Sequence, residues 1–134
     1  MIVVDSSALV AILLDEPETQ IFEDIIAGGE DCIISAVNAH ETACVLRSRI
    51  GPPAVARLWR LLADCEIEIA PFDEAQMRAA AAAFDRYGKG VNSKARLNLA
   101  DCAAYALAVT MDAPLLFKGD DFSETDVRAR RGLD

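Results

Sequence analysis

The sequence predicts a three-layer α/β fold, with a central, mainly parallel sheet of four to five strands and helices on both faces. Three observations support this prediction. Short apolar runs alternate along the chain with segments of helical length. The length of 134 residues suits one domain, residues 1–134. With 53% hydrophobic and 26% charged residues, the chain has the composition of a folded core and not of a disordered segment.

The first strand and two helices are predicted before residue 31. Residues 2–4 are isoleucine and valine, which favour a buried strand. Ser6 or Ser7 can cap a helix that runs through residues 8–14. A proline in its first turn opens a second helix over residues 17–27, and a Gly-Gly pair ends it.

The middle of the chain continues the alternation. Residues 32–34 form a second short strand, and Ser35 caps a long helix over residues 36–50. Glycine and proline close that helix, and the next proline starts another over residues 53–63. Residues 66–69 alternate between glutamate and isoleucine, the pattern of an edge strand.

The last third holds two more helices and the last clear strand. Asp73, with glutamine three residues later, predicts a capping box for a helix over residues 74–86. Residues 87–97 form a polar loop, and an asparagine caps the helix over residues 98–111. Residues 114–117 are the final strand. Strands that alternate with helices imply parallel crossovers, and ligands bind beyond the carboxyl ends of such strands.

The charge is strongly asymmetric. The net charge is −9, and residues 1–46 contain nine acidic residues and no basic one. An acidic protein binds nucleic acid poorly, because that affinity depends on neutralising phosphates. A nucleic-acid substrate would therefore require a bound metal ion or a local basic patch.

The cysteines and the N-terminus indicate a cytoplasmic protein. The four cysteines (Cys32, Cys44, Cys65 and Cys102) are scattered without a Cys-x-x-Cys pair, and there is one histidine, so a zinc site is not expected. We interpret them as buried thiols in a reducing compartment. The N-terminus lacks the basic region of a signal peptide, and no apolar run reaches the ~18 residues of a membrane span.

Acidic residues recur where the predicted strands end. Asp5 follows the first strand, Asp101 lies in the first turn of a helix, and Asp120 and Asp121 follow the last strand. Glu41 lies in the helix after the second strand. Each aspartate taken alone also fits an ordinary helix cap, first-turn acid or turn residue.

Together, these acids favour a metal site. Converging carboxylates repel one another unless a cation lies between them. Oxygen ligands without histidine or cysteine select Mg²⁺ or Mn²⁺. Such an ion can lower the pKa of a bound water and contact a phosphate, which is the chemistry of phosphodiester hydrolysis.

Four motifs give the chain a family resemblance. They are Met-Ile-Val-Val-Asp-Ser-Ser-Ala-Leu at the start, Glu41 in a helix after a strand, Leu-Asn-Leu-Ala-Asp-Cys-Ala-Ala-Tyr around Asp101, and Leu-Leu-Phe-Lys-Gly-Asp-Asp-Phe near the end. In this order and spacing they resemble the PIN-domain ribonucleases, and more closely the VapC-type toxins of type II toxin–antitoxin pairs.

The resemblance implies an Mg²⁺- or Mn²⁺-dependent endoribonuclease that is active on RNA. It also implies a homodimer, and inhibition by a VapB-type antitoxin whose tail occupies the active-site groove. The larger toxin–antitoxin complex would reach DNA only through the antitoxin, and no membrane is involved.

Residue roles follow from the same resemblance. Asp5 and Asp101 match the usual metal ligands, and Glu41 matches the acid that acts through the metal's waters. Asp121 is favoured as the fourth acid, with Asp120 in reserve. Ser7 matches a small hydroxyl that lies beside the metal.

Other residues admit a structural interpretation beside a functional one. His40 is adjacent to Glu41, and neighbours on a helix point about 100° apart, so the two cannot face one site. Trp59 and the leucines around it form a stripe that predicts core packing, with a dimer or antitoxin contact as the alternative. Three basic residues of the polar loop are candidates for RNA contact or for a solvated surface: Lys89, Lys94 and Arg96.

Two other functions are compatible with parts of the sequence. A phosphatase acting on a small phosphorylated substrate also begins with a strand and an aspartate. Phosphatases with an aspartyl nucleophile need a second aspartate two residues later, where this chain has Ser7. A non-catalytic binding module would be expected to have lost acids, and none of the set is missing.

Overall fold

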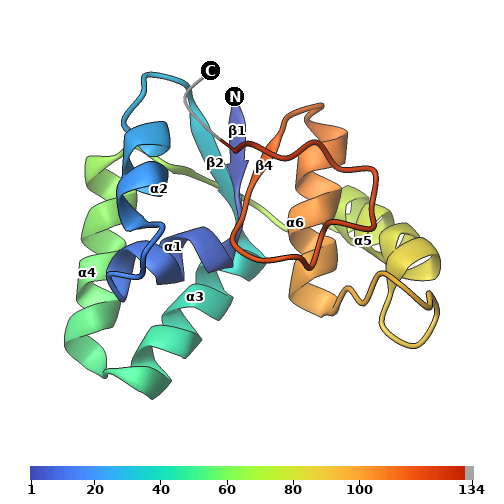
Figure 1. Ribbon diagram of the computed structural model, residues 1–134, viewed down its shortest axis with the longest axis horizontal. Coiled ribbons are helices and arrows are strands. Elements are labelled where there is room, and N and C mark those ends of the chain that lie inside the picture. The colour runs from blue at the N-terminus through green and yellow to red at the C-terminus, as the bar shows by residue number, and fades with distance from the viewer. Residues whose placement is uncertain (132–134) are drawn as a thin grey trace.

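The computed structural model describes residues 1–131 and shows a parallel sheet between two layers of helices (Figure 1). The strand order is β3-β2-β1-β4, and every pairing is parallel. The strands are β1 (Ile2–Val4), β2 (Cys32–Ser35), β3 (Glu68–Ala70) and β4 (Leu115–Leu116). The helices are α1 (Ser6–Leu13), α2 (Thr19–Ile26), α3 (Ala36–Arg49), α4 (Pro52–Asp64), α5 (Glu74–Tyr87) and α6 (Leu99–Thr110). The predicted fold class is confirmed.

The alternation of side chains in β1 divides the core into two halves. Ile2 and Val4 point into a cluster built with α1 to α4. Val3 points the other way, into a cluster built mainly with α5 and α6. Because successive strand residues face opposite sides of a sheet, three apolar residues in a row are what a strand covered on both faces requires. Figure 1 shows these two helical layers on either side of the strands.

Several predicted boundaries and caps differ in the structure. Neither predicted serine caps α1: the N-cap is Asp5, whose side chain accepts from the Ser7 N–H. Helix α2 begins at Thr19 and not at Pro17, because the chain first makes a turn and the Thr19 hydroxyl then bonds back to the Ala11 carbonyl of α1. A contact with the preceding helix therefore sets this boundary.

The predicted capping box is incomplete at α5, and a complete one is found at α6. Asp73 caps α5 through the Gln76 N–H, but the Gln76 side chain donates to the Thr110 hydroxyl and does not return to the cap. The complete capping box lies at α6 instead, between Asn98 and Asp101. This arrangement fixes Asp101 at the first turn of a helix that is otherwise buried.

The prediction that all four cysteines are buried is correct only in part. Cys32 and Cys102 are buried, and Cys65 is half-buried, but Cys44 is exposed on α3. Its exposure contradicts the expectation of four buried thiols, because its face of α3 borders a groove and not the core. No helix among residues 1–131 is long and apolar enough to cross a lipid bilayer.

Candidate active site

Asp5 lies at the end of β1, and the parallel pairing of the sheet fixes its position. Its backbone N–H donates to the Leu116 carbonyl of β4 over 2.9 Å. The residue is only 4% exposed. One carboxylate oxygen, Oδ2, accepts from the Ser7 N–H at 3.0 Å and from the Ser7 hydroxyl at 2.6 Å. The other oxygen, Oδ1, is buried and has no hydrogen-bond partner.

Ser7 connects Asp5 to the loop that follows β4. Its hydroxyl donates to Asp5 and accepts from the Lys118 N–H at 2.9 Å. The side chain of Lys118 in turn pairs with Glu16 at 3.0 Å and Glu18 at 3.1 Å, between α1 and α2. Ser7 therefore contacts Asp5 directly and holds one of its two oxygens in place.

Glu41 is positioned by a residue that sequence reasoning missed. The Ser6 hydroxyl of α1 donates to Glu41 Oε1 of α3. Ser6 is buried, and Glu41 is half-buried. The two serines after Asp5 thus serve two different carboxylates. The only sign of this in the sequence is that adjacent residues of a helix point about 100° apart, so Ser6 and Ser7 face different neighbours.

Asp101 is held at the N-terminus of α6. Its Oδ2 accepts from the Asn98 N–H at 3.1 Å, and its own N–H donates to Asn98 Oδ1 at 2.8 Å. The residue is half-buried. Its predicted structural role as a first-turn acid and its predicted catalytic role are compatible, because the capping bond uses only one carboxylate oxygen.

Asn38 is the second residue that the sequence did not single out. Its side chain is fully buried on α3, and its Nδ2 donates to the Ala100 carbonyl of α6 at 2.9 Å. Asn38 precedes Glu41 by almost one helical turn, and Ala100 precedes Asp101. This single bond therefore connects the two helices that carry these acids. A polar side chain inside an otherwise small and apolar stretch was the signal available in the sequence.

The pKa values show that the four acids share one electrostatic environment. Burial raises the pKa of Asp5 to about 6, against the lowering effect of the Ser7 hydrogen bonds, and the charges of Glu41 and Asp121 raise it further. Burial likewise raises the pKa of Asp101 to about 7, with added repulsion from Asp5, Asp121 and Glu41. Carboxyl groups with raised pKa values lack a compensating positive charge.

Asp121 and Asp120 are both exposed in the loop after β4. Asp121 is close enough to raise the pKa values of Asp5 and Asp101. The choice of Asp121 over Asp120 as the fourth acid stays a prediction.

The residues fit a hydrated divalent cation. The buried, unpartnered Oδ1 of Asp5 can accept a cation, and the neighbouring donors are oxygen atoms. Within residues 1–131, however, no three His, Cys, Asp or Glu side chains approach closely enough to surround an ion on their own. Mg²⁺ commonly binds one or two carboxylates and keeps several waters, which suits such an open arrangement.

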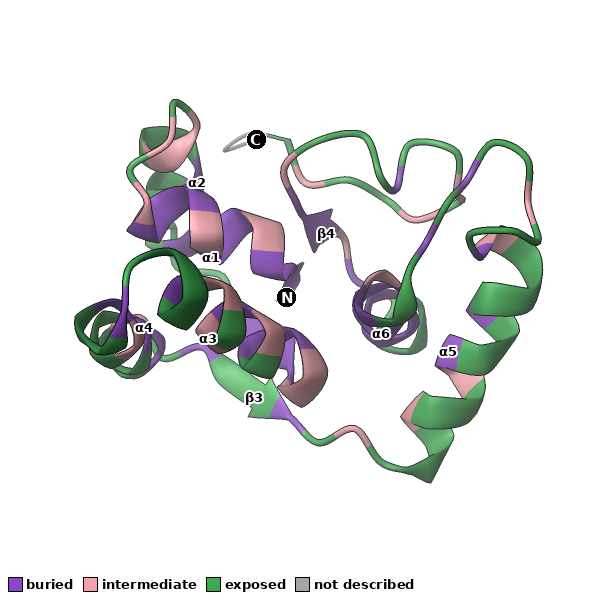
Figure 2. Cartoon of the chain, turned by 90° about the horizontal axis from the view of Figure 1, so that it is seen from below, coloured by how far each residue is buried: buried purple, intermediate pink, exposed green. Residues whose placement is uncertain are grey.

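The remaining candidates divide into three groups. Leu58 and Leu62 are buried as predicted, but Trp59 is 49% exposed, so the core-packing interpretation is wrong for it. His40 is exposed and lines a groove between α3 and α4. The three basic residues of the polar loop (Lys89, Lys94 and Arg96) are exposed, and the loop borders the N-terminus of α6 in Figure 2. Their contact with RNA stays a prediction.

Replacing Asn38 with alanine is expected to lower the free energy of unfolding by about 1–3 kcal/mol, because a buried hydrogen bond between α3 and α6 would be lost. Urea denaturation measures this change. Gln20→Ala is the matched control, since the Gln20 amide bonds to Asp24 on the exposed surface of α2 and its loss should change stability by less than about 0.5 kcal/mol. Equal effects of the two substitutions would argue against a special role of the Asn38 bond.

The chain is similar to known proteins along nearly its whole length. Residues 2–128 match the family model described as the PIN domain. Ribonuclease VapC of Mycolicibacterium smegmatis is 43% identical over 127 residues, which cover 95% of this chain and 98% of that protein. Ribonuclease VapC42 of Mycobacterium tuberculosis is 40% identical over 126 residues, covering 94% and 96%.

Solved structures share the fold at lower identity. Mycobacterium tuberculosis VapC20, described as a sarcin–ricin loop cleaving toxin, superposes with a TM-score of 0.82 at 16% identity, covering 98% of this chain and 99% of that one. VapBC2 from Rickettsia felis, bound to a DNA fragment from its promoter, gives 0.72 at 14% identity, covering 96% of each chain. A toxin–antitoxin complex from Klebsiella pneumoniae gives 0.71 at 16% identity, covering 94% and 93%.

Proposed function

This chain belongs to the PIN domain family and, within it, to the VapC ribonucleases, and from that membership we propose that it is an endoribonuclease toxin neutralised by a VapB-type antitoxin. One structural observation supports the chemistry above all others. Carboxylates from four separate segments interact beyond the ends of the parallel strands, and a buried oxygen of Asp5 has no partner. Such a site can bind a cation and a phosphodiester together.

The proposed cofactor is Mg²⁺ or Mn²⁺. Asp5 and Asp101 would hold the ion, Glu41 would act through its waters, and Asp121 would be the fourth acid. When bound, the ion would neutralise charge on the scissile phosphate and lower the pKa of a water molecule. The groups that shift the pKa values of Asp5 and Asp101 include no histidine and no cysteine.

The protein's own part in the reaction is to orient the carboxylates. Ser7 fixes Oδ2 of Asp5 and leaves Oδ1 available. Ser6 binds one oxygen of Glu41. Asn98 holds Asp101, and the first-turn N–H groups of α6 add partial positive charge near that carboxylate. These contacts reduce the reorganisation needed when the substrate binds.

The small-molecule phosphatase is not supported. The position where an aspartyl-nucleophile phosphatase needs its second acid is occupied by Ser7, whose hydroxyl is engaged with Asp5 and Lys118. The relatives at about 40% identity are named ribonucleases.

The direct experiment is cleavage of purified RNA by the purified chain. We expect cleavage with Mg²⁺ or Mn²⁺, and none when EDTA removes the ion. Mapping of the 5′ ends of the products identifies the target. A chain that cleaves no RNA from its own host under any metal condition would contradict the proposed function.

The proposed partners follow from the same assignment. Solved structures of this fold include toxin–antitoxin complexes, one of them with promoter DNA. For this chain we propose a VapB-type antitoxin, a cytoplasmic location, a homodimer within a larger complex, and contact with DNA only through the antitoxin. Sedimentation at tens of micromolar tests the dimer, and a purely monomeric protein would contradict it.

The antitoxin is expected to inhibit by placing an arginine against the carboxylates. A guanidinium can pair bidentately with such groups and compete with the metal. Glu41→Gln or Asp101→Asn should therefore weaken antitoxin binding by roughly 2–5 kcal/mol, because the partner arginine would be left buried and unpaired. Calorimetry measures this loss. Unchanged affinity in both variants would place the antitoxin elsewhere.

A further inference from the structure

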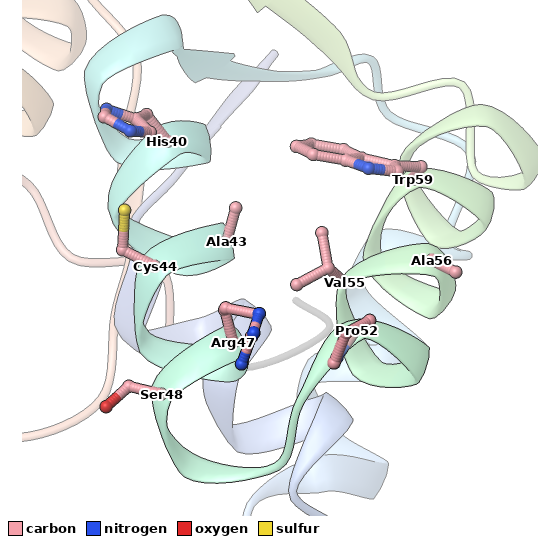
Figure 3. Close-up of a pocket in the computed structure, with 9 residues that line it drawn as sticks. All are labelled: His40, Ala43, Cys44, Arg47, Ser48, Pro52, Val55, Ala56 and Trp59. Atoms are coloured by element: carbon pink, nitrogen blue, oxygen red, sulfur yellow. The ribbon is translucent and has the colours of Figure 1, made fainter.

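A groove between α3 and α4 lies outside the cluster of acids. It is widely open to solvent, has a volume of about 710 Å³, and its apolar lining includes Ala43, Val55 and Trp59. Figure 3 shows Trp59 extending from α4 across the groove toward α3, with His40 and Arg47 contributed by α3. None of these side chains takes part in the chemistry proposed above.

The two helices around this groove carry a net positive charge in an otherwise acidic protein. Helices α3 and α4 together contain four arginines and two acidic residues, Glu41 and Asp64, in a chain whose net charge is −9. The four arginines are exposed: Arg47, Arg49, Arg57 and Arg60. Within residues 1–131 none of them forms an ion pair, whereas Arg78, Arg86 and Arg128 each pair with a carboxylate. Unpaired guanidinium groups are available to an external anion and can bind phosphate bidentately.

The groove is close to the acids along the chain and in space. His40 lines the groove, and the next residue, Glu41, belongs to the acidic cluster on another side of the same helix. The turn between α3 and α4 projects beyond the end of the sheet where α1 begins (Figure 1). An RNA strand bound at the acids would therefore cross only the width of α3, about 10 Å, before it reaches the groove.

From these observations we propose that the α3–α4 groove binds single-stranded RNA next to the scissile phosphate, with Trp59 stacking on a base and the arginines contacting phosphates. The proposal rests on the ribonuclease function given above. It supplies the local basic patch that an acidic nuclease needs in order to hold a polyanion. Small side chains at Ala43 and Ala56 leave room for a flat base beside the indole.

The distribution of charge favours RNA over a protein helix. A bound amphipathic helix would use the apolar floor and Arg47. Three of the four arginines lie outside the groove lining: Arg49, Arg57 and Arg60. Arg47 in the lining and Arg60 next to Trp59 in the sequence, both exposed, suit a ligand with one phosphate per nucleotide.

Trp59 makes the groove directly observable, because it is the only tryptophan in the chain. The full chain carrying Asp101→Asn, which prevents cleavage, is titrated with a fluorescein-labelled single-stranded RNA of mixed sequence. We expect quenching of the Trp59 emission in parallel with the rise in RNA anisotropy, and weaker binding at higher salt. RNA binding that leaves Trp59 emission unchanged would overturn the proposal.

Cleavage kinetics separate this contact from a structural effect. In the otherwise native chain, Trp59→Ala and Arg47→Gln should each raise KM for a long RNA about tenfold and leave kcat unchanged. A minimal oligonucleotide that spans only the acids should be cleaved equally by all variants. Arg78→Gln is the matched control, because Arg78 is an exposed helical arginine on α5 that is already paired with Glu74.

The remaining outcomes are distinguishable. An unchanged KM for the long RNA, together with loss of antitoxin binding in Trp59→Ala, would assign the groove to the protein partner and overturn the proposal. Failure of the native chain to cleave any RNA would refute the ribonuclease function, and the Trp59 titration still tests the groove in that case because it needs no cleavage.

Discussion

Asp5→Asn and Asp101→Asn are each expected to lower the rate of RNA cleavage by about 10³-fold while leaving the protein folded. Asparagine has nearly the same shape as aspartate, and its amide oxygen can still cap a helix. The substitution therefore removes the negative charge proposed to hold the cation and preserves the local fold. A steady-state cleavage assay at saturating Mg²⁺ measures the loss.

The chain contains a control that matches Asp5 closely. Asp73 is also an N-cap aspartate, and its side chain accepts from the Gln76 N–H as that of Asp5 accepts from the Ser7 N–H. Asp73→Asn removes the same charge at the same kind of helix terminus, on α5, and should leave cleavage unchanged. If Asp5→Asn were as active as Asp73→Asn, the proposed site would be refuted.

The positions of the acids were predictable because they depend on the sheet. Asp5 follows three apolar residues that can only be a buried strand, and parallel strands end at one edge. Asp101 was predictable from the asparagine three residues before it, which marks the start of a helix. In both cases a local pattern fixes the backbone, and the fold class then brings the segments together.

The contacts that orient these acids were not predictable in the same way. The Ser6–Glu41 and Asn38–Ala100 bonds join residues that are 35 and 62 positions apart. Their existence depends on how α1, α3 and α6 pack, and a single sequence carries no direct record of helix packing. The exposure of Trp59 has a similar cause, because a tryptophan close to buried leucines in a helix has the same local pattern whether or not another element covers it.

The structural and functional interpretations of the acids turn out to be compatible. Asp5 caps α1 with one oxygen and leaves the other without a partner. A cap alone does not require burial of an unsatisfied carboxylate oxygen, which costs solvation free energy. The unpartnered oxygen therefore gives a physical reason to place a cation at the cap of α1.

The last prediction concerns this cost directly: the metal-free protein is expected to become less stable as the pH rises from about 4 to about 7. The pKa of Asp5 is raised from 3.8 to about 6 in the folded chain, so between these values the folded state binds more protons than the unfolded state. Its contribution is fully present below the unfolded pKa and is lost as the pH rises through the folded pKa. The loss from Asp5 amounts to about 3 kcal/mol. The raised pKa of Asp101, about 7, changes stability in the same direction.

Urea denaturation in EDTA at a series of pH values measures this slope, and the same series with saturating Mg²⁺ shows what the cation restores. We expect Mg²⁺ to stabilise the protein most at the alkaline end, where both carboxylates are ionised, by RT ln(1 + [L]/Kd). Asp5→Asn should flatten the slope in EDTA and make the metal-free protein more stable than the native chain above pH ~7, since the ionised buried carboxylate is gone. Asp73→Asn should retain the native slope. The proposed cation site would be contradicted if the stability in EDTA rose over this pH range. It would also be contradicted if Mg²⁺ and Mn²⁺ did not change the stability.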